Sequence, residues 1–222
     1  MRKRIWALAA LTAIYVCGAA LQAGAAELLD MQIHGQWAAG VVSAGKEDAV
    51  RLCTGEGAVL LVLDMYPAPS GKGPGSCRMT LLERAMGSMG TEAKAMFPLT
   101  LNGRIYLDGG AIRKARFHYA LEGQVAVARI EGDFSDAFWK EAERRPMLRM
   151  EIGWDERHVF LLNFFLDGFR AARRHGERLV EKVRPRRPGQ EDAFGEEEFL
   201  SLILSRSWEK GARREFSPGP GK

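Results

Sequence analysis

Short apolar runs separated by turn-forming residues extend from Gly35 to Asn163. The run Met147–Ile152 alternates apolar and charged residues, which is the period of two expected for a strand with one buried face. Many short strands at close spacing favour an antiparallel sandwich or barrel. The predicted strands are Trp37–Ser43, Ala49–Thr54, Ala58–Tyr66, Cys77–Arg84, Met96–Leu101, Arg104–Leu107, Ala111–Tyr119, Gln124–Ile130, Met147–Ile152 and His158–Asn163.

Turn signals separate several of these runs. Asn102-Gly103 and Asp108-Gly109-Gly110 are residue combinations that adopt tight turns readily. Each is therefore predicted to join two neighbouring strands.

Three segments carry a helical pattern instead. The first is predicted from Asp133, where acidic residues suit a helix start, to about Arg145, before Pro146. The second extends from about Asp167 to Val183. The third, Glu196–Lys210, places apolar residues three and four positions apart.

These elements predict a mainly β chain: an antiparallel β-sandwich-like domain over residues 27–183 with two embedded helices. Residues 184–195 contain Pro185 and Pro188, which disfavour helix, and are predicted to be a linker. The helix 196–210 forms a C-terminal extension. Residues 211–222 are rich in Gly and Pro and are predicted to be a disordered tail.

The N-terminus has the pattern of a secretory signal peptide. Arg2, Lys3 and Arg4 precede an uncharged stretch that ends in small residues at Ala26. Cleavage is expected after Ala25 or Ala26, which would place the mature chain in the periplasm. The alternative is an uncleaved anchor, since about 20 apolar residues can span a bilayer.

Removing the signal changes the charge balance. The whole chain carries a formal charge of +4, of which the first basic residues supply three, so the remainder carries 4 − 3 = +1. A nearly neutral domain gives no reason to expect a nucleic-acid partner.

The expected periplasmic location affects what the cysteines are predicted to do. Cys17 lies in the signal and is expected to leave with it, so that Cys53 and Cys77 remain. An even pair in an oxidising compartment favours a disulfide, and we therefore expect a Cys53–Cys77 bond.

Candidate catalytic chemistry is sparse. No G-x-S-x-G nucleophile motif is present. The four histidines, His34, His118, His158 and His175, have no partner spacing in the sequence. No cofactor or metal is predicted, although a hydrolase site assembled from distant residues stays an alternative.

Methionines supply a second alternative. Met79, Met86, Met89 and Met96 follow Cys77, and methionine sulfur can hold Cu(I). The competing interpretation is that these side chains fill gaps in a core.

Two surfaces are candidates for partner contact. The first is basic, and it could bind anionic lipid or another envelope polyanion unless it is only a solvated helix face. The second is the apolar face of the C-terminal helix, which could dock into a partner or pack on its own domain. The basic residues are Arg170, Arg173, Arg174, Arg178, Arg184, Arg186 and Arg187, and the helix face comprises Leu200, Ile203, Leu204 and Trp208.

The order of elements resembles the invasion-associated locus B family, small exported proteins of Gram-negative bacteria. The resemblance rests on Gly35-Gln36-Trp37, the cysteine pair separated by strands, and the segment Phe134 to Ala172. That segment ends in Leu166-Asp167-Gly168-Phe169-Arg170-Ala171-Ala172, which is similar to the family's closing L-x-G-F-x-x-A. The chain departs from the family in lacking a second cysteine pair and in extending beyond His175.

The resemblance implies a β-rich envelope domain without established catalytic residues. Together with the export signal, it leads us to expect a non-enzymatic envelope binding or accessory protein. Its expected partner is another envelope protein or polyanion, with peripheral membrane contact as a further option.

Overall fold

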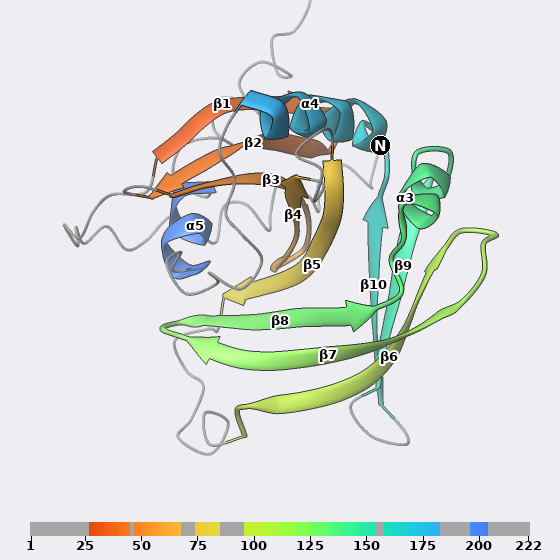
Figure 1. Cartoon of the computed structure of the whole chain (residues 1–222). Coiled ribbons are helices and arrows are strands. Elements are labelled where there is room, and N and C mark those ends of the chain that lie inside the picture. The colour runs from red at the N-terminus through yellow and green to blue at the C-terminus, as the bar shows by residue number, and fades with distance from the viewer. Residues whose placement is uncertain are drawn as a thin grey trace, which may run out of the picture.

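Figure 1 shows a computed structural model of the chain, which describes residues 27–44, 47–67, 74–84, 96–153, 158–182 and 196–203. The expected signal, linker and tail lie outside these residues, as does the third helix beyond residue 203.

Ten strands of the described residues form one antiparallel sheet, which confirms a mainly β fold. In space they follow the order β1-β2-β3-β4-β5-β8-β7-β6-β9-β10, so β1 and β10 are the two edges. The strands are β1 (Glu27–His34), β2 (Trp37–Ala44), β3 (Glu47–Glu56), β4 (Val59–Pro67), β5 (Pro74–Arg84), β6 (Leu99–Leu107), β7 (Arg113–Glu122), β8 (Val125–Gly132), β9 (Met147–Gly153) and β10 (Val159–Phe165).

The sheet curls around one main core. Trp37 of β2, Leu63 of β4, Phe117 of β7 and Phe164 of β10 belong to the same buried cluster, although they come from both ends of the strand order. The two halves therefore pack as in a sandwich, but the pairing of β5 with β8 makes them one continuous sheet.

The curl brings the end of β10 against the start of β2. The indole Nε1 of Trp37 donates to the carbonyl of Phe165 at 2.9 Å, and the amide of Gln36 donates to the carbonyl of Asp167 at 3.2 Å. Gly168 has a φ of +83°, and a Cβ at this position would lie 1.7 Å from the carbonyl oxygen of His34. We call these five residues and His34 the closing corner.

In the described part of the chain, three helices are attached to the sheet: α3 (Asp136–Ala142), α4 (Phe169–Lys182) and α5 (Glu196–Leu202). Helix α4 packs across β1 to β5 and buries Phe169, Leu179 and Val180. Gly176 lets α4 approach the sheet closely, because a Cβ there would lie 2.6 Å from the sulfur of Met65.

Helix α5 lies on the opposite face of the sheet. Its Phe199, Leu200 and Ile203 are buried in a second cluster with residues such as Val62 of β4 and Val127 of β8. The central strands are thus covered on both faces, which explains the unbroken apolar run Val59-Leu60-Leu61-Val62-Leu63 in β4.

One predicted turn was wrong, and one strand was missed. Asn102-Gly103 is not a turn, because both residues lie inside the single strand β6. Glycine is required there for packing, since a Cβ on Gly103 would lie 2.2 Å from the carbonyl oxygen of Glu151. The strand β1 was not predicted at all, and its regular alternation is interrupted by a bulge between Leu29 and Gln32.

The expected disulfide is not formed, and both cysteines are free thiols. Cys53 lies opposite Val62 in β4 and Cys77 lies opposite Met65, an offset of three residues that places the two side chains on opposite faces. With β4 between them, the strands alone separate the pair by about 10 Å, beyond the reach of a disulfide. Burial raises the pKa of both thiols to about 12.

The closing corner yields a stability prediction. Gly168→Ala should lower the free energy of unfolding by more than about 3 kcal/mol, because it adds both left-handed strain and overlap with the His34 carbonyl. Gly57→Ala is the matched control: φ is +59° and nothing lies within 4 Å of its Cβ, so only the strain of about 1–2 kcal/mol is expected. Denaturant unfolding measures both, and equal losses would contradict the corner's geometry.

Candidate functional site

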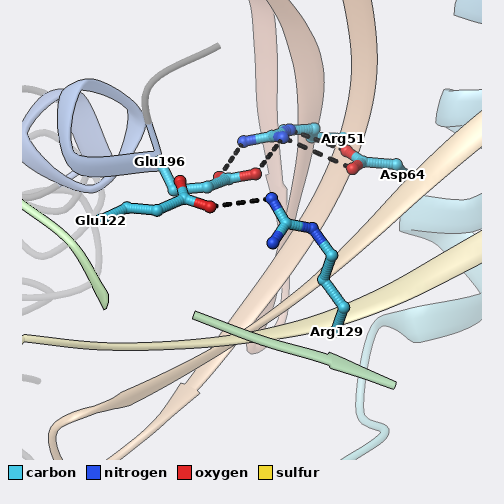
Figure 2. Close-up of polar contacts among 5 residues, drawn as sticks. All are labelled: Arg51, Asp64, Glu122, Arg129 and Glu196. Carbon is cyan, nitrogen blue, oxygen red and sulfur yellow. Dashed lines mark hydrogen bonds and ion pairs between the residues drawn. The ribbon is translucent and has the colours of Figure 1, made fainter. Parts of the chain in front are cut away.

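Three buried charged side chains form a cluster between the sheet and α5. Arg51 of β3 is 3% exposed and donates from Nε to Asp64 Oδ1 at 2.7 Å. Its Nη1 and Nη2 donate to the two carboxylate oxygens of Glu196 at 2.7 and 2.8 Å (Figure 2). The ring of Phe199 lies 4.5 Å from the guanidinium carbon of Arg51. We call Arg51, Asp64 and Glu196 the buried charge cluster.

Strand register assembles this cluster. Arg51 and Asp64 are direct cross-strand partners in β3 and β4, and Asp64 is also paired in register with Arg78 of β5. Arg51 and Asp64 each interrupt an apolar run, which is the sequence signal that could have identified this pair. Neither partner was singled out from the sequence, because their pairing depends on the register.

The electrostatics of the buried charge cluster favour the charged form of Arg51. Burial by itself lowers the pKa of Arg51, but the carboxylates of Asp64 and Glu196 outweigh burial and raise it overall. Burial also raises the pKa of Asp64, against the opposing effect of Arg51. Each buried charge is stable only beside its partners, because water is excluded from this surface. The cluster therefore fixes the position at which α5 packs on the sheet.

A second ion pair lies on the same face of the sheet. Arg129 of β8 donates to Glu122 of β7 at 2.8 Å, and both side chains are about one-third exposed (Figure 2). Exposure to solvent weakens such a pair relative to the buried charge cluster.

The arginines of the predicted basic surface do not all lie on one exposed surface. Arg173 is only 6% exposed, and it binds Asp136 at 2.6 Å and Glu143 at 3.0 Å. It therefore ties α4 to α3 and does not face solvent. Arg170, Arg174 and Arg178 are exposed on α4, and Arg184, Arg186 and Arg187 lie outside the described residues.

The helix face predicted for partner docking is used internally. Leu200 is 7% exposed and Ile203 is 1% exposed, both within the second cluster. Leu204 and Trp208 lie outside the described residues. Between the two options left open by the sequence, the described part of this helix packs on its own domain.

Two histidines that are distant in the sequence meet beneath α4. The rings of His34 and His175 have centroids 5.6 Å apart, and His175 Nε2 lies 3.1 Å from the carbonyl oxygen of Asp30. Burial lowers the pKa of His34, and the nearby His175 and Arg178 lower it further. The pair connects the bulge of β1 to α4, a contact that sequence spacing could not reveal.

The methionines proposed for copper divide between the core and the surface. Met79 is 1% exposed within the main cluster, whereas Met96 is 48% exposed. Met86 and Met89 lie outside the described residues. Across the described ranges, no three His, Cys, Asp or Glu side chains are grouped as a metal site would need.

Among the described strands, the edge strand β10 carries the most exposed large apolar side chains. Val159 and Phe160 are each 55% exposed, Leu161 is 62% exposed and Phe165 is 50% exposed. The strand contains no charged residue. From the sequence alone, this apolar run predicts a strand that is covered on both faces. The exposed surface could therefore not be predicted from the sequence. The strand order shows that β10 is an edge of the sheet.

The two ends of β10 differ in whether their outward backbone groups are bound. The amide of Asn163 donates to the carboxylate of Glu56 in β3, and the carbonyl of Phe165 accepts from Trp37. Backbone groups of alternate residues in a strand point to the same side, so those of Val159 and Leu161 also point away from β9. We call the outward backbone groups and side chains of Val159 and Leu161 the open edge.

No helix in the described part of the chain is long and apolar enough to cross a membrane.

No family model matches the chain, and no curated protein matches it in sequence. The crystal structure of invasion associated protein B from Bartonella henselae is similar, with a TM-score of 0.46 and 13% identity, over 67% of this chain and 96% of that chain. Similarity at this level does not establish membership of a family.

The buried charge cluster predicts a large cost for one substitution. Arg51→Ala leaves two carboxylates buried without their partner and should lower the free energy of unfolding by about 3–5 kcal/mol. Arg129→Ala, in the partly exposed pair on the same face, should cost less than about 1 kcal/mol. Thermal or denaturant unfolding compares the two, and a small loss for Arg51→Ala would contradict the role of the cluster.

The histidine pair predicts a pH dependence. Because the pKa of His34 is lower in the folded chain than its ordinary value of 6.5, the stability that it contributes is present above pH 6.5 and is lost as the pH falls through the folded pKa. We expect His34→Gln to reduce the slope of unfolding free energy against pH below about 6.5. The comparison with wild type isolates this residue, and identical slopes would refute the pKa shift.

Proposed function

We propose that this chain is an exported, non-enzymatic binding or accessory protein of the bacterial envelope, and that it binds a protein partner through β10. The observation that carries the proposal is the concentration of exposed apolar side chains on one uncharged edge strand. Sheet edges in soluble proteins are normally protected by charges, prolines or covering segments, because an exposed apolar edge pairs with other chains. An edge without charge is therefore a candidate interaction surface.

Export supports the location of this function. The basic residues Arg2, Lys3 and Arg4, the apolar segment and the small residues before Glu27 are the parts of a signal peptide. The sequence resemblance to the invasion-associated locus B family agrees with an envelope protein.

The basic residues of α4 support this proposal less strongly than β10 does. Arg173 is occupied by Asp136 and Glu143, and Arg170 lies 3.8 Å from Glu143. Apolar contact at β10 therefore replaces polyanion binding as the main interaction in our account.

The proposal can be tested with surface variants of the exported protein. Leu161→Lys places a charge on the exposed apolar strand and should abolish recovery of the partner after cross-linking in the envelope fraction, with at least a tenfold loss of yield. Leu161 is 62% exposed, so the variant should keep the melting temperature of wild type. Arg174→Glu, on exposed α4, is the control and should retain the partner.

Loss of the same partner with Arg174→Glu and its retention with Leu161→Lys would contradict the proposal and favour the basic surface. Recovery of the protein only from the cytoplasm would contradict its location.

A further inference from the structure

We infer that the partner binds as an extended, uncharged β-strand that pairs with the open edge of β10. This inference rests on the proposed function and specifies the form of the partner. A strand is the one regular structure that supplies both the backbone groups and the alternating side chains that this edge can accept.

The backbone argument comes from the other half of the same strand. The backbone groups of Asn163 and Phe165 point away from β9, and one group of each is already bound: the Asn163 amide donates to Glu56, and the Phe165 carbonyl accepts from Trp37. Val159 and Leu161 have the same orientation. Within the described residues the sheet ends at β10, so no described strand pairs with these groups.

The side chains define the chemistry of the partner. Val159 and Leu161 lie on one face of the strand and are 55% and 62% exposed. A paired strand would place its own side chains beside them, where apolar residues gain from burial and a charge would be costly. The partner segment is therefore apolar or neutral at the residues beside Val159 and Leu161.

The closing corner also limits where the partner strand can lie. Glu56 and Trp37 occupy the edge at Asn163 and Phe165, so a partner cannot pair with that end without displacing them. Its pairing is confined to the N-terminal half of β10. The same contacts prevent the partner from sliding toward Phe165, which fixes the register.

A peptide titration tests this mode of binding. The probe is a synthetic peptide of alternating valine and threonine with a lysine at each end, added to the isotopically labelled mature chain. We expect amide chemical-shift changes and slowed hydrogen exchange at Val159 and Leu161. The amide of Asn163, which is already bound to Glu56, should not change.

Three variants separate backbone pairing from apolar contact. Leu161→Pro removes an outward N–H, which edge strands tolerate, and should weaken peptide binding about tenfold or more. Leu161→Thr keeps the N–H and should bind nearly as well as wild type. Phe165→Lys is the matched control on the same face at the occupied end, and it should leave binding unchanged.

Each other outcome overturns the inference in a recognisable way. Equal binding by wild type and Leu161→Pro would mean apolar contact without strand pairing, and the proposed function would survive. No change at the open edge with millimolar peptide would overturn strand addition, while partner loss with Leu161→Lys would still support the function. A dimer of the chain alone that Leu161→Lys abolishes would make a second copy the occupant.

Discussion

The closing corner is the contact on which the rest of the structure depends. Trp37 is 1% exposed, donates to the end of β10 and packs against Phe169 with ring centroids 4.8 Å apart. It thereby joins two strands that are far apart in the sheet order and sets the start of α4. The curl of the sheet, the position of α4 and the division of β10 into an occupied and an open end all follow from this packing.

The two faces of the sheet serve different purposes. The inner face holds the main core beneath α4, and the outer face of the central strands holds α5 through the buried charge cluster. Arg51 and Glu196 are 145 residues apart in the sequence, and their bond holds α5 against β3. This leaves β10 as the described strand with the most exposed large apolar side chains.

Local patterns predicted local structure well. The alternation in β9 and the helical spacing of α4 were correctly interpreted, because each depends on neighbours in the sequence. Features that depend on strand register were not predictable: Gly103 resembles a turn residue but is required by close packing, and the cysteines sit on opposite faces. The His34–His175 contact and the exposed edge of β10 required the strand order and the curl. The candidate site was therefore the part that the sequence disclosed least.

Hydrogen exchange of individual amides in the free protein tests the central claim most directly. Our account predicts slow exchange for Phe160, Leu162 and Phe164, whose amides point toward β9, and for Asn163, whose amide is bound to Glu56. It predicts fast exchange for Val159 and Leu161. Protection of Val159 and Leu161 equal to that of their neighbours would show that this edge is already covered, and would contradict the account.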